Sequence, residues 1–415
     1  MFGRVCVAAG LFTVAASFSV SAQQADVIHY WTSGGESRAI GVFAHEYEKR
    51  GGKWVDDPAV GPQAELSLAM SRIAGGNPPT AMQWQTGAPT RELAQQGLLT
   101  ELDWLANAGD WRKNLPPLLL EKVTVDGHVY SAPVDINGAN WMFYSTKVFQ
   151  QAEVQPPKTW DEFFAEAPKI QAAGYIPLAF GANSQQESWL FMALLAGLGG
   201  SDLYRAVAIS HDPKAASSAG VEATFNVMRR LRQYVDAGST NRKWNDTLAL
   251  VETNKAALMI VGDWAKGDFS AANLTLDKDY GCALAPGRTG STDAYIMGVD
   301  ALVFPKADKP DQIDAQHKLA ELIMDPAVQT KFALAKGSVP AMLTADITSL
   351  DRCAKLGRQV MAEGPSHQLP NLSLVFTPDS YGQYTDLLGQ YWANSQMTAP
   401  DATAKFAAIV AAAGP

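Results

Sequence analysis

The chain has 415 residues, of which 47% are hydrophobic and 18% are charged, and its formal net charge is −9. At roughly 150 residues per domain, this length predicts two or three domains with enough apolar residues to fill their cores. An acidic chain without a block of Lys and Arg is a poor candidate for binding nucleic acid or an anionic membrane, which leaves small neutral ligands open.

Residues 1–22 have the features of a cleavable export signal. A basic start at Arg4 precedes an apolar stretch over residues 5–20, and small residues lead to Ala22. The stretch is too short and too polar for a membrane-spanning helix. We therefore expect cleavage near Ala22 and a soluble mature protein in the periplasm.

The mature chain would carry two cysteines, Cys282 and Cys353. In an oxidising compartment an even pair favours one disulfide. A metal site is not expected, because no second Cys or His stands near either cysteine at the spacing of metal ligands. No cofactor is predicted.

Helical and strand-like stretches alternate along the mature chain, which favours an α/β fold. In the first pair, Val27 and Ile28 fit a buried strand, a Gly34-Gly35 turn follows, and Phe43 lies on the apolar face of a helix. In open α/β sheets, ligands dock where the end of a strand meets the start of a helix. The turn after this strand is therefore the first candidate binding position.

The later elements continue the alternation, without a low-complexity linker, a repeat or a charge block between them. We expect an amphipathic helix over 60–76, a strand over 80–84, a helix over 89–96, extended segments over 129–137 and 141–144, a helix after a capping box of Thr159 and Glu162, strands over 255–264 and 298–304, and a helix over 325–336.

Short sequence motifs, spread along the chain, carry a resemblance to a known family. They are Tyr-Trp-Thr-Ser-Gly-Gly-Glu at 30–36, Asn-Pro-Pro at 77–79, Tyr-Ser-Ala-Pro-Val at 130–134, Pro-Pro-Lys-Thr-Trp-Asp-Glu-Phe at 156–163, Gly-Asp-Trp-Ala at 262–265, Asp-Pro-Ala-Val-Gln at 325–329 and Lys-Gly-Ser-Val-Pro at 336–340. Together they resemble the extracellular solute-binding proteins of ABC sugar importers, the family typified by maltose-binding protein. The similarity is greatest to its glucose-binding branch.

The resemblance implies two α/β lobes that close around one sugar by a hinge, which needs only a few residues to absorb the rotation. One lobe is expected to hold 23–134 plus 300–342, and the other 135–299 plus 343–415. The crossings between them are expected near 133–137, near 297–300 and just past Pro340. The implied partners are a neutral sugar and the membrane permease subunits of the importer, with the receptor itself a monomer.

The resemblance also implies which side chains contact the sugar. A pyranose offers hydroxyls at its rim and C–H patches on its faces, which carboxylates and amides or aromatic rings can meet. A carboxylate that accepts from a hydroxyl makes a charge-assisted bond of roughly twice the usual strength. The implied contacts, with the two indoles as stacking rings, are Tyr30, Trp31, Glu36, Gln85, Trp264, Asp300, Lys336 and His367.

Several of these residues have an alternative role in the fold. Tyr30 and Trp31 are adjacent on a strand and face opposite sides unless the strand bends, so one of them can be core. Glu36 lies three residues after Ser33 and can be the return arm of a capping box. Trp264 follows a buried strand and can be core packing.

Asp300 interrupts an apolar strand, where an unpartnered carboxylate would cost several kcal/mol. Either a hydrogen-bond network at the hinge or a sugar hydroxyl must satisfy it. Asp263 is expected to fix its own turn rather than to touch the sugar. Gln85, Lys336 and His367 would otherwise be read as surface residues.

The chain departs from the glucose-binding branch at three places. It has Tyr30 where the branch carries Trp, Gln85 in a region where the branch carries Lys, and the segment 137–140 where the branch carries bulkier residues of the His-Arg type. Smaller side chains at the crossing would open space for a larger sugar, such as a disaccharide or a glycoside.

The sequence therefore predicts a receptor that captures glucose or a related mono- or disaccharide for an importer. A binding protein for another small polar solute is the first alternative. A glycoside hydrolase is the second, since such enzymes need two carboxylates and Glu36, Asp263 and Asp300 qualify by type. No Gly-x-Ser-x-Gly, His-Glu-x-x-His or phosphate-loop motif appears, so we expect no enzymatic activity.

Overall fold

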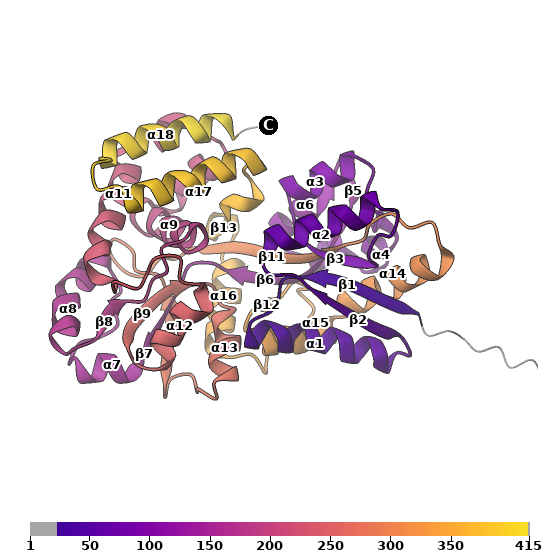
Figure 1. The fold of residues 1–415 in the computed structure, drawn as a ribbon, viewed down its shortest axis with the longest axis horizontal. Helices are drawn as coiled ribbons and strands as arrows, with labels where there is room; N and C mark the ends of the chain where they lie inside the picture. The colour runs from indigo at the N-terminus through magenta and orange to yellow at the C-terminus, as the bar shows by residue number, and fades with distance from the viewer. Residues whose placement is uncertain (1–22, 414–415) are drawn as a thin grey trace, which may run out of the picture.

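The computed structural model describes residues 23–413 and shows two α/β lobes side by side (Figure 1). The predicted export signal and its cleavage site lie outside the described residues. Each lobe is built on its own sheet, one of seven strands and one of four. The α/β fold class predicted from the alternating pattern is confirmed.

The first lobe contains the seven-stranded sheet, in the order β12-β6-β11-β3-β1-β2 with β13 paired to β11. Strands β1, β2 and β3 are parallel, whereas β11 runs antiparallel to β3 and β6. The bounds are β1 Gln24–His29, β2 Lys53–Pro58, β3 Ala81–Gln85, β6 Ser131–Gly138, β11 Tyr295–Val303, β12 Val339–Pro340 and β13 Gln368–Pro370.

Helices cover both faces of this sheet (Figure 1). Val27 of β1 belongs to the large core cluster with Phe43 and Phe332, whereas its neighbour Ile28 belongs to a small cluster with Ala69 and Leu93. Consecutive strand residues thus bury opposite faces, as the pleat requires. The helices and the small hairpin are α1 Gly34–Lys49, α2 Pro62–Ala74, α3 Ala88–Gln95, α4 Asp103–Ala108, α5 Trp111–Asn114, α6 Pro117–Val123, β4 Thr124–Val125, β5 His128–Val129, α14 Pro310–Ile323 and α15 Pro326–Lys336.

The second lobe surrounds the four-stranded sheet, in the order β10-β7-β9-β8. Its strands are β7 Trp141–Ser145, β8 Ile176–Leu178, β9 Ala256–Val261 and β10 Tyr280–Leu284. Its helices are α7 Thr146–Gln151, α8 Trp160–Ala172, α9 Ser184–Ala208, α10 Pro213–Ala216, α11 Ala219–Leu231, η1 Arg232–Tyr234, α12 Trp244–Glu252, α13 Ala265–Ala271, α16 Arg352–Ala362, η2 Pro365–His367, η3 Leu372–Leu374, α17 Pro378–Ala393 and α18 Ala399–Ala412.

Among the described residues, α9 alone is long and apolar enough to cross a membrane by length and composition. Half of its most apolar window is buried inside the molecule, where it packs beside α11 and α17. Its backbone breaks at Gly200, whose φ of 78° and ψ of 170° are not helical. An apolar helix of this kind is typical of the centre of a large core.

Two long strands lead from the first lobe toward the second (Figure 1). The chain leaves the large sheet after β6, enters the small sheet at β7, and returns between β10 and β11. A third passage follows β12 at Pro340. The pairing of β6 with β11 continues from Ser131 to Gly138, so both strands stay in the large sheet through the regions expected to cross. The lobe boundaries at 134/135 and 299/300 fall inside these strands and remain a prediction.

A disulfide joins Cys282 of β10 to Cys353 of α16, the pair expected from the sequence. Their Cα atoms lie 6.4 Å apart, within the usual range for such a bond. Asp351 caps α16, and its carboxylate also forms an ion pair with buried Lys266, with Nζ and Oδ2 3.0 Å apart. The disulfide and the Lys266–Asp351 ion pair therefore both link the segment after Pro340 to the second lobe.

Most local predictions hold with small shifts at the ends. The helix expected over 60–76 begins at Pro62 and ends at Ala74, and the strand expected over 80–84 is Ala81–Gln85. The capping box of Thr159 and Glu162 is present. The strand expected over 255–264 ends at Val261, because the backbone turns there to begin α13.

Candidate functional site

Polar and aromatic side chains converge where the lobes meet. From the first lobe come the carboxyl ends of β1 and β3, the start of α1 and the last turn of α15. From the second lobe come the turn after β9 and parts of α9 and α17. The carboxyl ends of parallel strands are where ligands bind in open α/β sheets.

A buried ion-pair network lies on the hinge strands. Lys336 is only 3% exposed at its side chain, and its ammonium contacts the carboxylate of Asp300 and lies 3.3 Å from Asp135 Oδ2. The two aspartates face each other across the β6–β11 pair. Burial raises the pKa of Asp135, and the charge of Lys336 opposes this increase.

Two amides complete the network around Asp300. Asn137 Nδ2 donates to Asp300 Oδ2 at 2.9 Å, and Gln83 Nε2 donates to Asp300 Oδ1 at 3.3 Å. The carboxylate is therefore satisfied by the hinge itself, which is the first of the two alternatives that its sequence position allows. Its side chain is nevertheless 14% exposed.

Tyr30 and Trp31, which follow the end of β1, differ in burial. Trp31 is 2% exposed and packs 5.5 Å from Phe332, with the Lys336 ammonium 5.1 Å from its ring. Tyr30 is only half-buried. Burial, and then the charges of Glu65 and Glu36, raise the pKa of its phenol. The structure gives Trp31 to the core and Tyr30 to the surface between the lobes.

Glu36 is the return arm of a capping box, the first of the two roles open to it. Its N–H donates to Ser33 Oγ at 3.3 Å, and its Oε2 accepts from the Ser33 N–H at 3.2 Å, which completes the capping box. Within residues 23–413, its Oε1 has no hydrogen bond. Burial raises the pKa of Glu36, and the charge of Lys336 opposes this increase. One oxygen therefore holds the helix start, and the other makes no hydrogen bond to the described residues.

The second lobe contributes a cluster of three indoles. The ring of half-buried Trp264 lies 4.9 Å from that of Trp189 and 6.4 Å from that of Trp244. Trp264 lies against Gly262, where an added Cβ would come within 2.0 Å of its ring. This tight fit fixes the orientation of the indole.

Tyr381 of α17 is a further aromatic residue from the second lobe. Its hydroxyl lies 3.3 Å from Ser188 Oγ, and its phenol influences the pKa of Tyr30. The sequence did not predict Tyr381, Trp189 or Trp244 as site residues, because none of them follows the end of a predicted strand.

Asp263 fixes the turn after β9, the role expected from the sequence. Its Oδ2 accepts from the Gly138 N–H at 2.9 Å and from the Tyr295 hydroxyl at 2.5 Å. Burial raises the pKa of Asp263 to about 7. The carboxyl thus joins the end of β6 to the turn that carries Trp264.

Gln85 and His367 differ in their relation to the other residues. Gln85 is half-buried and pairs with Asp300 across the β3–β11 ladder. His367 Nδ1 lies 2.7 Å from the carbonyl oxygen of Asp293, seven positions before Asp300. That separation is roughly 20 Å along an extended chain. The structure brings Gln85 beside Asp300, whereas His367 lies beside Asp293, before the start of β11.

The lobes also meet at a close backbone contact between α1 and α13. A Cβ added to Gly35 would lie 2.6 Å from the carbonyl carbon of Gly267. Ser33 Oγ donates to Asp268 Oδ2 at 3.0 Å, and Arg38 Nη2 donates to the Gly267 carbonyl oxygen at 2.6 Å. Only glycine permits the two helix starts to approach so closely.

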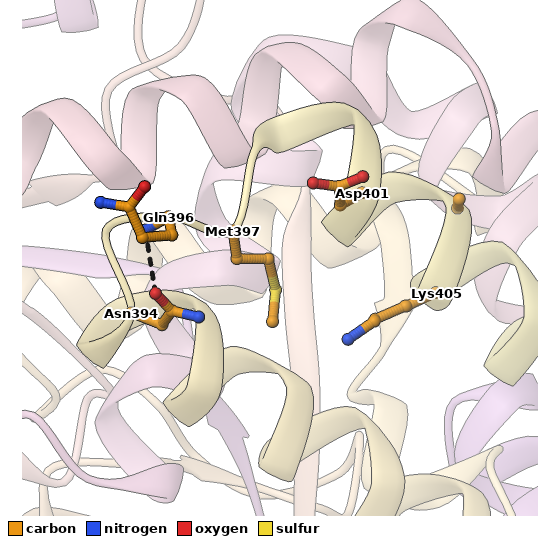
Figure 2. A pocket seen from close by; sticks show the side chains of 6 residues that line it. Asn394, Gln396, Met397, Asp401 and Lys405 are labelled. Carbon is orange, nitrogen blue, oxygen red and sulfur yellow. Dashed lines mark hydrogen bonds between the residues drawn. The ribbon is translucent and has the colours of Figure 1, made fainter.

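A surface hollow of about 470 Å³ lies elsewhere, at the connection of α17 and α18 (Figure 2). In Figure 1 this connection is at the end of the second lobe away from the first. The hollow contains no aromatic ring, and its lining residues are Asn394, Gln396, Met397, Asp401, Ala404 and Lys405. It does not share residues with the group between the lobes.

Residues 63–349 match the family model of the bacterial extracellular solute-binding proteins. The chain belongs to this family. It is 34% identical over 352 residues to a "Probable sugar-binding periplasmic protein" of Rhizobium meliloti (strain 1021), with 84% of each chain covered. A protein of the same name from Brucella melitensis biotype 1 is 35% identical over 335 residues, covering 80% of this chain and 78% of that one.

Solved structures of solute receptors share the fold of this solute-binding protein. The receptor AcbH, which has an exclusive preference for β-D-galactopyranose, superposes with a TM-score of 0.78 at 20% identity, covering 94% of this chain and 98% of that one. A solute-binding protein of Thermotoga lettingae bound with α-D-tagatose also gives 0.78, at 19% identity, covering 94% and 99%. The two-lobe receptor fold and the prediction of a receptor rather than an enzyme are confirmed.

Proposed function

We propose that this solute-binding protein captures a sugar between its lobes in the periplasm and delivers it to the permease subunits of an ABC importer. The observation that carries the proposal is the placement of Trp264, with its two neighbouring indoles, on the lobe opposite Tyr30 and Glu36. Rings can cover the C–H faces of a sugar, and carboxylates can accept from its hydroxyls. The names of the relatives support the same ligand class.

The proposed ligand is glucose or a related mono- or disaccharide. The proposed contacts are Tyr30, Glu36, Gln85, Trp264, Asp300 and Lys336. Trp31 packs its ring against the Lys336 ammonium and is not a proposed contact. His367 is not included either, because it lies beside Asp293 rather than beside the other contacts. Titration calorimetry of the mature chain against a panel of monosaccharides and disaccharides tests the proposal, with product analysis of the same samples. Saturable binding without hydrolysis is expected, and no binding to any sugar would contradict it.

Trp264→Ala is expected to weaken sugar binding by about 1–3 kcal/mol, because a stacked aromatic contact is lost. Trp104→Ala is the matched control, since Trp104 is an exposed indole that packs 4.6 Å from His317 in the first lobe. Calorimetry on both folded variants decides the point. Equal affinities of the two variants would remove Trp264 from the site.

Glu36→Gln is expected to weaken binding about tenfold, or about 1.4 kcal/mol, because an amide gives a sugar hydroxyl a weaker acceptor than a carboxylate. Glu162→Gln makes the same change in the capping box at the start of α8 and controls for its effect on the cap. Both variants should lose similar stability in urea, and only Glu36→Gln should lose affinity. Loss of affinity in both would assign Glu36 to capping alone.

Gly35→Ala is expected to weaken binding by about tenfold or more, because a methyl group cannot fit against Gly267 when α1 and α13 meet. Gly41→Ala lies on the same helix with nothing within 4 Å of the added Cβ, and should leave affinity unchanged. Unchanged affinity of Gly35→Ala would show that this contact is not needed for the bound state.

A further inference from the structure

The two lobes meet on both faces of the large sheet. Val27 and Ile28 are consecutive residues of β1, so they point to opposite faces. Phe43 of α1 shares a core cluster with Val27, whereas Leu93 of α3 shares a different cluster with Ile28. Helices α1 and α3 therefore lie on opposite faces of the sheet. Each begins just after a strand that ends where the lobes meet, α1 after β1 and α3 after β3.

On the face of α1, the second lobe comes into backbone contact with the helix start. A Cβ added to Gly34 would lie 3.3 Å from the Ala271 Cβ, and one added to Gly35 would lie 2.6 Å from the carbonyl carbon of Gly267. Gly267 and Ala271 belong to α13, which follows β9 of the small sheet. The proposed contact Glu36 is the residue after Gly35. The lobes therefore leave no room for a methyl group one residue away from a proposed contact.

On the face of α3, a second backbone contact joins the lobes at Gly87. A Cβ added to Gly87 would overlap the carbonyl oxygen of Leu374 in η3. The N–H of Leu372, also in η3, donates to Met192 Sδ of α9 at 3.4 Å, so this segment is held by the second lobe. Gly87 lies two residues after the proposed contact Gln85. This meeting point also excludes a methyl group.

The hinge strands fill the side of the cleft between these two faces. The crossing segment 137–140 has small side chains, but they are packed. A Cβ added to Gly138 would overlap the ring of Tyr295 and would lie 2.6 Å from Trp141 Nε1. Both ends of the Asn140 amide bond to the backbone around the start of β11, and Asn140 is fully buried. The small residues at the crossing therefore do not open space for a larger sugar.

We propose, on the basis of the proposed sugar-binding function, that Gly35 and Gly87 determine the size of the ligand and restrict it to a single sugar ring. The first-lobe contacts Glu36 and Gln85 lie within two residues of these glycines. A second ring attached to the bound sugar would have to pass between the lobes beside one of the two glycines, where the closed structure excludes even a methyl group. The preferred ligands are monosaccharides rather than disaccharides or longer glycosides.

Calorimetry of the full mature chain with matched sugars tests the size limit. The probes are glucose, galactose, fructose and xylose, and disaccharides built from these rings, namely cellobiose, maltose, lactose, melibiose, sucrose and xylobiose. The tightest monosaccharide is expected to bind at least tenfold more tightly than every disaccharide. A disaccharide that binds within tenfold of it, or more tightly, would overturn the size limit and leave the proposed function standing. Absence of binding to every sugar of either size would end both.

Gly87→Ala provides a second readout, with Gly97→Ala as its matched control. The two glycines flank α3 and have similar positive φ angles, 80° and 72°, so alanine causes similar backbone strain at both. Nothing lies within 4 Å of a Cβ added to Gly97. Both variants should melt at similar temperatures without sugar. Gly87→Ala should bind the best monosaccharide at least tenfold more weakly than Gly97→Ala, because the methyl group prevents closure. A smaller difference would show that Gly87 does not determine ligand size.

Discussion

Lys336→Met is expected to lower the free energy of unfolding by about 3–5 kcal/mol, because it leaves the carboxylates of Asp135 and Asp300 without their cation. Asp135 is fully buried, and the Lys336 side chain is 3% exposed. Methionine keeps the length and packing of the side chain, so the loss reports the missing charge. Urea unfolding at neutral pH measures it.

Lys331→Met is the matched control on the same helix. Lys331 pairs with Glu46 at 2.7 Å, but its side chain is 51% exposed, and pairs of this kind contribute at most about 1 kcal/mol. If Lys336→Met lowers the free energy of unfolding no more than Lys331→Met does, the buried ion-pair network does not stabilise the fold as expected.

The loss in Lys336→Met should depend on pH in a defined direction. Burial raises the pKa of Asp135, and Lys336 opposes this, so its removal raises that pKa further. A carboxyl with a raised pKa holds its proton more tightly in the folded chain. Its contribution to stability is therefore greatest below its unfolded pKa and falls as the pH increases through its folded pKa. The deficit should be smaller at pH 5 than at pH 8.

Removal of the disulfide by Cys282→Ala with Cys353→Ala is expected to destabilise the protein by roughly 4 kcal/mol, less any effect of strain in the native state. The two residues are 71 positions apart, and a loop of that length loses considerable entropy when it is closed in the unfolded chain. Unfolding in urea with and without reductant measures the difference.

The double variant should be insensitive to reductant, whereas the parent protein should lose stability when reduced. Thiol counting under denaturing, non-reducing conditions is the independent control. Two free thiols in the mature parent chain, or equal stability of the parent and the double variant, would show that the bond does not form.

Local features of the site could be predicted from the sequence because short-range rules govern them. Alternation along a strand indicated that Tyr30 and Trp31 face opposite sides, and the spacing of Ser33 and Glu36 indicated a capping box. The capping box is present in the structure, and Trp31 packs in the core while Tyr30 is only half-buried. The rules did not decide which ring is core, because Phe332, which covers Trp31, comes from a helix about 300 positions later.

Other features depend on tertiary packing and left no local signal. From the sequence, Asp300 could only be recognised as needing a partner. Its partners in the structure, Lys336 and the amides of Asn137 and Gln83, come from three different elements. Glu65 reads in the sequence as an ordinary acidic residue at a helix start. Its burial is visible only when α2 is laid over the sheet.

The assignment of His367 to the contacts stays a prediction. The pairing of β13 with the first residues of β11 holds it near Tyr295, at the other end of β11 from Asp300. A motif match transfers a residue type, whereas strand register decides where the side chain lies.

A crystal structure of the mature protein with the sugar that binds best in calorimetry tests the central claim most directly. We expect the sugar between the lobes, with one face against Trp264 and its hydroxyl groups near Tyr30 and Glu36. A sugar found only elsewhere, for example in the hollow between α17 and α18, would contradict capture between the lobes.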